Sequence, residues 1–214
     1  PGPAPAAVFH SRALLLAAVR HPSILTLHAA FVHAERAWLV LDLCDAGSVQ
    51  DVIGRHGPLD EAQACAVCSG ALRGLAHLHG MRPMPMVHRD VKAGNLLLTS
   101  CGEVKLADFG IAAALRTDDG TNLGTVIGSP FWMAPEMIER GVYGPPSDVW
   151  ALGITLIEMV EGRAPHAHMK PPVHAMFRIV EDEPPTLQEP DRWSARFAAV
   201  VGSCLQKRPA DRTS

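Results

Sequence analysis

Lysine, acidic residues and glycine are absent or scarce in the first part of the chain. Lysine does not occur before Lys92, and the first acidic residue is Glu35. Gly2 is the only glycine before Gly47, and the G-x-G-x-x-G pattern of phosphate-binding loops is absent from all 214 residues. The opening PGPAPAA is rich in proline, which excludes a helix or a central strand there and predicts a linker.

Long apolar runs and a strong charge of one sign are also missing. The longest apolar stretch near the start, Ala13–Val19, is much too short to span a bilayer, and no secretion signal opens the chain. The formal net charge of −3 creates no broad basic field, so nucleic acid is disfavoured as a general partner. The chain starts without methionine and stops at Arg-Thr-Ser without a helix-ending signal, so we expect it to be part of a longer protein.

The five cysteines are an odd number and are scattered, which favours a reducing, intracellular setting. Cys65 and Cys68 form a lone C-x-x-C, a spacing found in zinc and redox sites. A zinc site needs a second pair of ligands at suitable spacing, and none stands out. Because the pair lies in an alanine-rich segment with helical periodicity, we expect two buried helix cysteines, with a metal or redox site as the alternative.

Hydrophobic periodicity predicts two strands followed mainly by helices. The strands are expected at Ile24–Val32 and Ala37–Leu43, joined by a polar turn. A short helix is expected before them at Phe9–Arg20, ended by His21-Pro22. Further helices are predicted at 48–53, 59–79, 135–140, 147–161, 174–180 and 194–206. This order favours an α+β fold with a mostly helical second part.

Four short motifs follow one another along the chain. They are His88-Arg89-Asp90-Val91-Lys92-Ala93-Gly94-Asn95, Asp108-Phe109-Gly110, Ala134-Pro135-Glu136 and Ser147-Asp148-Val149-Trp150-Ala151-Leu152-Gly153. A single three-residue string recurs by chance, but this ordered and spaced set does not. At these residues the sequence resembles the eukaryotic protein kinases, and the lysine at position 92 resembles the serine/threonine type.

The resemblance implies ATP-dependent transfer of a phosphoryl group to serine or threonine of protein substrates. Asp90 matches the catalytic aspartate, which orients the substrate hydroxyl and accepts its proton. Lys92 matches the lysine that offsets charge on the transferring phosphate. Asn95 and Asp108 match the oxygen ligands of Mg²⁺. Taken singly, each of these residues could equally be an ordinary surface or capping residue.

The resemblance also implies where ATP would bind. The segment Leu41–Cys44 corresponds to the hinge, so the backbone groups of Asp42 and Cys44 are expected to face adenine. Leu97 would lie beneath the adenine ring, and Asp108 would reach the nucleotide through the metal. The expected cofactors are therefore ATP and Mg²⁺.

Further residues match structural positions of the family. His88 and Phe109 correspond to two members of the stacked apolar spine, and Asp148 to the residue that anchors its base. Glu136 and Arg212 correspond to a buried ion pair that ties the activation segment to the large lobe. Removing one partner of such a pair would leave an uncompensated buried charge.

The activation segment narrows the resemblance. Its stretch Gly124–Met133 is similar to the sterile-twenty (STE) group, particularly the Hippo-type kinases. Thr125 matches the activating phosphorylation site, where a phosphate would give Arg89 a doubly charged partner. The alternative for Thr125 is a plain hydroxyl in a mobile loop. Ser129 replaces the more usual threonine but keeps the hydroxyl that contacts the catalytic residues.

The resemblance fails at the start of the chain. A protein kinase needs a Gly-rich loop, a third-strand lysine and a glutamate on the following helix, and all three are missing. Aligned through His21-Pro22, the glutamate position falls on Arg12, which has the opposite charge. We therefore expect a protein kinase-like two-lobe fold. Residues 1–43 would form a partial small lobe without its first three strands, and residues 44–214 a large lobe with a truncated last helix.

Two functions remain open. The first is an STE-like signalling kinase, inactive as the isolated chain, that acts in the cytoplasm on protein substrates under an upstream activating kinase. The second is a pseudokinase-like scaffold or interaction lobe without catalysis. The retained Asp90, Lys92, Asn95 and Asp108 favour the first, and the missing lysine, glutamate and glycines favour the second. A third expectation is poor folding, because two strands alone would expose an open sheet edge.

Overall fold

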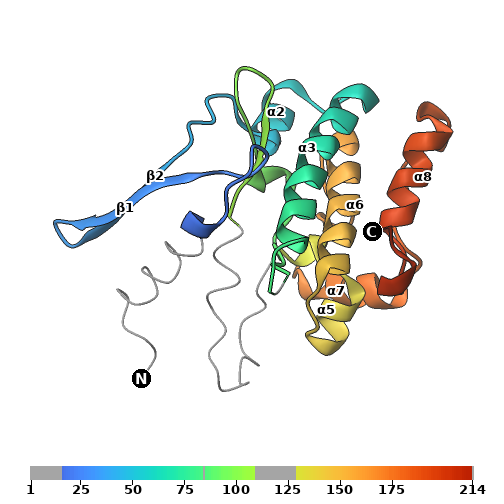
Figure 1. Ribbon diagram of the computed structural model, residues 1–214. Coiled ribbons are helices and arrows are strands. Elements are labelled where there is room, and N and C mark those ends of the chain that lie inside the picture. The colour runs from blue at the N-terminus through green and yellow to red at the C-terminus, as the bar shows by residue number, and fades with distance from the viewer. Residues whose placement is uncertain (1–15, 84, 109–128, 214) are drawn as a thin grey trace.

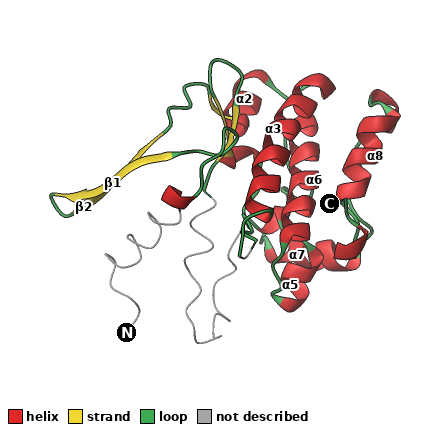
Figure 2. Ribbon diagram, viewed as in Figure 1, coloured by secondary structure: helices red, strands yellow, loops and turns green. Residues whose placement is uncertain are grey.

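The computed structural model describes residues 16–83, 85–108 and 129–213. Its architecture is α+β, as predicted, with a small strand-rich region and a larger helical part (Figures 1 and 2). The strands are β1 (Leu27–His33), β2 (Arg36–Leu41), β3 (Gly47–Ser48), β4 (Leu96–Leu98) and β5 (Val104–Leu106). The α-helices are α2 (Val49–His56), α3 (Glu61–His79), α5 (Pro135–Arg140), α6 (Pro145–Glu161), α7 (Val173–Glu181) and α8 (Ala195–Cys204). Short 3-10 helices are η1 (Ala93–Asn95), η2 (Pro130–Trp132), η3 (Pro190–Arg192) and η4 (Pro209–Asp211).

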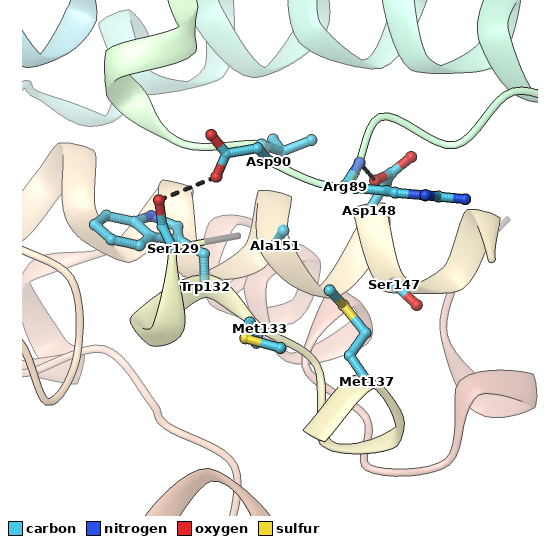
Figure 3. A pocket seen from close by; sticks show the side chains of 10 residues that line it. Arg89, Asp90, Ser129, Trp132, Met133, Met137, Ser147, Asp148 and Ala151 are labelled. Carbon is cyan, nitrogen blue, oxygen red and sulfur yellow. Dashed lines mark hydrogen bonds between the residues drawn. The ribbon is translucent and has the colours of Figure 1, made fainter. Parts of the chain in front are cut away.

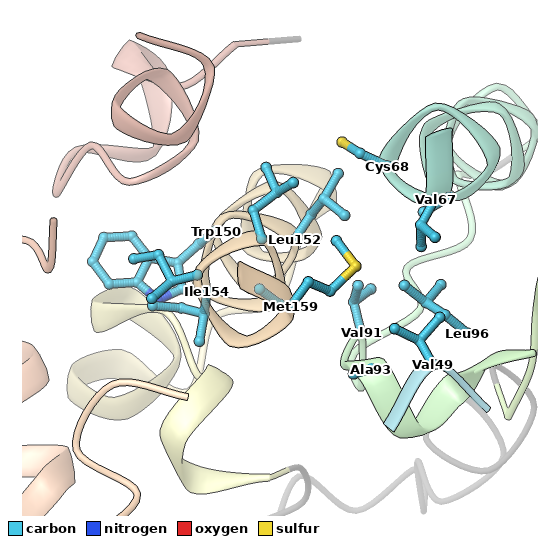
Figure 4. Close-up of a cluster of buried hydrophobic side chains, with 14 of the residues drawn as sticks. Val49, Val67, Cys68, Val91, Ala93, Leu96, Trp150, Leu152, Ile154 and Met159 are labelled. Carbon is cyan, nitrogen blue, oxygen red and sulfur yellow. The ribbon is translucent and has the colours of Figure 1, made fainter. Parts of the chain in front are cut away.

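Helix α6 forms the centre of the hydrophobic core. Nearly all of its residues from Ser147 to Val160 are buried, and Trp150 is completely inaccessible to solvent. Helix α3 packs on one side of α6 and helix α8 on another (Figure 1). Figure 4 shows Met159 of α6 among side chains from α2, α3 and the segment 91–96. Apart from a few polar residues such as Asp148 and Glu158, α6 is apolar on every side, which favours a position in the interior.

Local capping explains where the helices begin and end. Ser48 caps α2 and Asp60 caps α3, each with a reciprocal capping box to the third helical residue. Helices α5 and α6 both begin with proline, whose fixed φ suits the first helical turn. They end at Gly141 and Gly162, whose φ values of 63° and 81° are left-handed and favour glycine.

A three-stranded antiparallel sheet lies beside α2 and α3 in the order β3-β4-β5. The segment before β1 continues this sheet, because Ile24 forms a parallel bridge with Leu106. The prediction of one strand over Ile24–Val32 was therefore wrong at its start. Ile24 and Leu25 pair with Leu106 of β5, and β1 begins only at Leu27. The three-residue strands β4 and β5 were not predicted, because such short apolar runs carry no periodic signal.

Strands β1 and β2 form an antiparallel hairpin that extends away from the helices (Figure 1). Among its residues only Leu27 is buried. Large apolar side chains are exposed along both strands, including Phe31 and Trp38, whose rings stack at 6.3 Å between centroids. Within the described residues, the hairpin is thus attached to the rest of the molecule only at its base.

The predicted helices agree with the observed ones to within a few residues. The predicted helix 135–140 coincides with α5, and 147–161 begins two residues late relative to α6. Of the predicted helix Phe9–Arg20, only residues 16–18 are described as helical, and Arg12 lies outside the described residues. Both Cys65 and Cys68 lie on α3, but Cys65 is exposed, so of this pair Cys68 alone is buried. Within the described residues, no helix is sufficiently long and apolar to cross a bilayer.

The close approach of α3 to β5 gives a test of this packing. A Cβ added at Gly70 would lie 2.5 Å from the Val104 Cβ, whereas one at Gly54 in α2 would meet nothing within 4 Å. We expect Gly70→Ala to lower the free energy of unfolding by about 1–3 kcal/mol through overpacking. Gly54→Ala is the matched control and should raise it by up to about 1 kcal/mol. Urea unfolding measures the stability of both variants. Equal stability of Gly70→Ala and Gly54→Ala would contradict the close packing of Gly70 against Val104.

Candidate active site

Asp90 is the centre of a hydrogen-bonded cluster that joins two distant parts of the chain. Its Oδ1 accepts a hydrogen bond from the Ser129 hydroxyl at 3.0 Å, and its Oδ2 lies 2.9 Å from the Lys92 Nζ. Lys92 Nζ also donates to Ser129 Oγ at 2.6 Å, so the three side chains contact one another. Figure 3 shows Ser129 below Asp90, with its hydroxyl directed at the carboxylate.

The charge of Asp90 is set by opposing effects. Burial acts to raise its pKa, because a carboxylate is poorly solvated there. The hydrogen bond and positive charge of Lys92, with hydrogen bonds from Ser129 and Asn95, outweigh burial and hold the pKa of Asp90 below its usual value. Asp90 is therefore ionised at neutral pH and can only accept hydrogen bonds.

Asn95 lies next to Asp90 and is connected to the segment that leads into Asp108. Its Nδ2 donates to the backbone carbonyl of Asp90 at 2.7 Å and to its Oδ2 at 2.9 Å. The backbone carbonyl of Asn95 accepts from Ala107 N at 2.9 Å. Asp108 follows directly, is exposed, and has a left-handed φ of 63°, which is unusual outside glycine. The chain thus brings Asn95 close in space to the residue that precedes Asp108.

Asp148 of α6 fixes the start of the H-R-D motif. Its Oδ2 accepts from His88 N and its Oδ1 from Arg89 N, both at 2.8 Å, and His79 Nε2 lies 2.8 Å from Oδ2. The carboxylate is 1% exposed. Figure 3 shows Asp148 against the backbone of Arg89, whose φ of 71° is left-handed. These bonds therefore hold a backbone conformation that arginine seldom adopts.

His88 is completely buried beside the backbone of Asp90. Its Nε2 lies 2.8 Å from the Ala107 carbonyl, and its Nδ1 accepts from Asp90 N at 3.3 Å. Burial lowers the pKa of His88, and the neighbouring Asp148 opposes this effect without reversing it. A neutral ring with its proton on Nε2 satisfies both contacts.

Glu158 joins the segment that carries Asp90 to the segment after Ser129. One oxygen of its buried carboxylate accepts from Ala93 N at 3.0 Å and from the Trp132 indole N–H at 2.9 Å. Burial raises the pKa of Glu158, and these two donors partly offset the effect. The hydrogen bonds place Trp132 beside the loop that carries Asp90.

Glu136 and Arg212 form the ion pair expected from the sequence. Two guanidinium nitrogens of Arg212 donate to the two Glu136 oxygens at 2.7 Å each. The Arg212 side chain is 0% exposed, also donates to three backbone carbonyls, and lies 5.1 Å over the Trp150 ring. Burial acts to raise the pKa of Glu136, but Arg212 and Ser147 lower it below its usual value.

A comparison with known families matches residues 9–214 to the protein kinase domain. The chain belongs to the protein kinase family. Two curated relatives both carry the name serine/threonine-protein kinase cst-1. The relative from Caenorhabditis elegans is 46% identical over 183 residues, which cover 85% of this chain and 36% of the relative. The one from Caenorhabditis briggsae is 46% identical over 176 residues, covering 82% and 35%.

These similarities confirm the predicted resemblance to serine/threonine kinases of the STE group and the Hippo type. The kinase chain spans about a third of the length of the curated relatives that it matches. Its α+β architecture agrees with the family assignment.

The other site residues predicted for this kinase chain lie at the end of β2, in β4, or outside the residues that the structure describes. Leu41 ends β2, and Asp42 and Cys44 follow it as half-buried residues. Leu97 in β4 is also half-buried and pairs with Lys105. Phe109 and Thr125 lie outside the described residues, so their predicted roles stay predictions.

Sequence reasoning missed several side chains that surround the site. His79, Trp132 and Glu158 contact the catalytic loop or its anchor, as described above. Tyr143 places its ring under the Arg89 guanidinium, 5.0 Å from centroid to carbon. The sequence offers only a weak indication of these contacts. A polar residue inside an apolar helix, such as Glu158, must have a hydrogen-bond partner, but the sequence does not show which residue that is.

The Glu136–Arg212 pair gives the second test. We expect Arg212→Met to lower the free energy of unfolding by about 3–5 kcal/mol at neutral pH, because Glu136 would keep an uncompensated buried charge. The matched control is Arg208→Met, since Arg208 is 81% exposed and lies 3.7 Å from Asp211. That change should cost less than about 0.5 kcal/mol.

The same pair predicts the direction of a pH effect. Because the folded-state pKa of Glu136 is lowered, the pair stabilises the protein above the unfolded-state pKa. This contribution is lost as pH falls through the folded-state pKa. The stability difference between wild type and Arg212→Met should therefore shrink on acidification, as measured by urea unfolding at several pH values. A constant difference would contradict the assignment.

Proposed function

We propose that this kinase chain carries the phosphotransfer residues of an STE-type signalling kinase, which uses ATP and Mg²⁺ to phosphorylate serine or threonine in protein substrates. The supporting observation is the Asp90 cluster, in which an ionised carboxylate, a lysine ammonium and a hydroxyl contact one another at 2.6–3.0 Å. Phosphoryl transfer depends mainly on positioning and charge neutralisation, and these groups supply both.

Each group of the cluster has a role in this proposal. Asp90 orients the substrate hydroxyl and accepts its proton, while Lys92 offsets charge that develops on the transferring phosphoryl group. Ser129 already bridges Asp90 and Lys92, which supports the idea that this pair can hold a hydroxyl. Asn95 keeps the Asp90 carboxylate in place through its amide nitrogen.

The donor set fits a magnesium ion. The side-chain nitrogen of Asn95 donates to Asp90, so the side-chain oxygen Oδ1 of Asn95 is the atom that remains for a cation. Asp108 adds an exposed carboxylate, and within the described residues no larger cluster of histidine, cysteine and acidic side chains gathers. Magnesium in kinases is bound by one or two protein groups together with substrate phosphates, and it neutralises phosphate charge when bound.

The nucleotide and the regulation complete the proposal. The backbone of Asp42 and Cys44 would bind adenine, with Leu41 and Leu97 as apolar neighbours. Phosphorylation of Thr125 by an upstream activating kinase would supply an anion to Arg89. We further propose that residues 1–43 belong to the small lobe, that residues 44–214 belong to the large lobe, and that the protein acts in the cytoplasm.

A second candidate function is a scaffold lobe without catalysis. It is favoured by Arg12, which stands where alignment through His21-Pro22 places the family's glutamate and has the opposite charge. Such a lobe would keep the buried anchors Asp148, Glu158 and Glu136 but would not bind Mg-ATP.

Substitutions of the proposed catalytic residues test the first function. In the full-length protein, Asp90→Asn should lower kcat by about 10²–10⁴-fold, because the proton acceptor is lost. Asp108→Ala should abolish phosphate transfer, because a metal ligand is lost. The exposed Asp191→Asn is the matched control and should keep wild-type turnover. Wild-type turnover in Asp108→Ala, measured by ³²P transfer to a generic protein substrate, would show that the magnesium assignment is wrong.

Nucleotide binding distinguishes the two functions. If the full-length protein binds Mg-ATP, a ligand concentration of about 100 times Kd should stabilise it by about 2.7 kcal/mol in a thermal shift experiment. A scaffold lobe should show no shift. The isolated 214-residue chain should transfer no appreciable phosphate, because its sequence holds no Gly-rich loop and no lysine before Lys92. Transfer by that chain that disappears in Asp90→Asn would contradict this expectation.

A further inference from the structure

The hinge segment is held by a side chain to which sequence analysis gave no role. The β1–β2 hairpin has exposed apolar residues along its length and is attached to the rest of the described structure at its base (Figure 1). Asp42, the first residue after β2, lies at this base. The orientation of the hinge therefore depends on the contacts of Asp42 and its neighbours.

The Asp42 carboxylate contacts three residues from two other segments of the chain. Its Oδ2 accepts from Thr26 N at 3.0 Å and lies 3.0 Å from the Lys105 Nζ. Its Oδ1 lies 2.8 Å from His28 Nε2, and its backbone N–H donates to the Thr26 carbonyl at 3.1 Å. One side chain thus joins the end of β2, the beginning of β1 and the middle of β5.

Lys105 and Asp42 are well shielded from solvent. Their side chains are 13% and 18% exposed, so their attraction is screened less than that of a surface pair. Lys105 Nζ also donates to the Pro22 carbonyl at 3.2 Å. Burial acts to raise the pKa of Asp42, but the hydrogen bonds from Thr26, Lys105 and His28 lower it well below its usual value. The carboxylate is therefore charged throughout the physiological pH range.

We propose that the Asp42 carboxylate is a positioning group for the nucleotide: its ion pair with Lys105 ties the hinge to β5 and so fixes the adenine-binding backbone relative to Asp108. The geometry supports this link, because β5 ends at Leu106 and Asp108 follows two residues later. This inference rests on the proposed kinase function. It adds that one side chain aligns the adenine end of the site with the metal end.

Steady-state kinetics of the full-length protein test the proposal. In Asp42→Asn and in Lys105→Met, the KM for ATP should rise about tenfold while kcat stays within about twofold, because neither side chain touches the reacting atoms. Asp182→Asn is the matched control: it removes an exposed pair with Arg178 at 3.1 Å and should leave both constants unchanged. His28→Gln should change KM by less than about twofold, because His28 is 52% exposed. An effect of His28→Gln larger than that of Lys105→Met would overturn the assignment to the Lys105 pair.

Hydrogen exchange of the full-length protein gives a readout that needs no activity. The backbone amides of residues 42–44 should exchange about tenfold faster in Asp42→Asn and Lys105→Met, while amides of α6 keep their protection and show that the variants fold. Unchanged exchange at the hinge, or faster exchange with an unchanged KM for ATP, would overturn the proposal. If the wild-type protein transfers no phosphate at all while hinge exchange responds, the kinase function fails and the Asp42–Lys105 link stands as a hinge contact.

Discussion

The buried carboxylate of Asp148 is the constraint on which the rest of the site depends. It binds two consecutive backbone amides, at His88 and Arg89, from a position that water does not reach. Charge-assisted hydrogen bonds of this kind are among the stronger ones in proteins, and an unsatisfied buried carboxylate is costly. The chain therefore enters the catalytic loop in one conformation, including the left-handed backbone of Arg89.

Two further side chains of α6 continue the same attachment. Glu158 accepts from Ala93 N at 3.0 Å, and the Thr155 hydroxyl, which donates to the Ala151 carbonyl of its own helix at 2.7 Å, lies 3.4 Å from the Val91 carbonyl. The loop thus runs along one buried helix from His88 to Ala93, and Asp90, Lys92 and Asn95 extend from a backbone that is fixed on its other side. This arrangement explains how a loop whose only regular element is the short helix η1 can hold three polar side chains within hydrogen-bonding distance.

The sequence predicted much of this arrangement and missed its cross-connections. The helices follow from local periodicity, and the Glu136–Arg212 pair was expected from the resemblance to a known family. Strands β4 and β5 were not predicted, because three-residue strands are stabilised by pairing with neighbouring strands and are too short to show a hydrophobic pattern of their own. The contacts of Glu158 with Trp132 and of Asp42 with Lys105 join residues far apart in the chain, so no local signal could reveal them. Cys65 was wrongly expected to be buried, because three-residue spacing turns Cys65 partly away from the face that Cys68 shares with the core.

The spacing of Asp148, Thr155 and Glu158 has a consequence for how this kinase chain can change in evolution. The three side chains lie on one face of α6, within an arc of about 80°, because Thr155 follows Asp148 by seven residues and Glu158 follows Thr155 by three. Insertion of a single residue between them would rotate one half of that face by about 100°. The loop would then lose one of its attachments while every residue type was still present. The length of α6 is therefore under a stricter constraint than the identity of most of its apolar side chains, which tolerate exchange at similar volume.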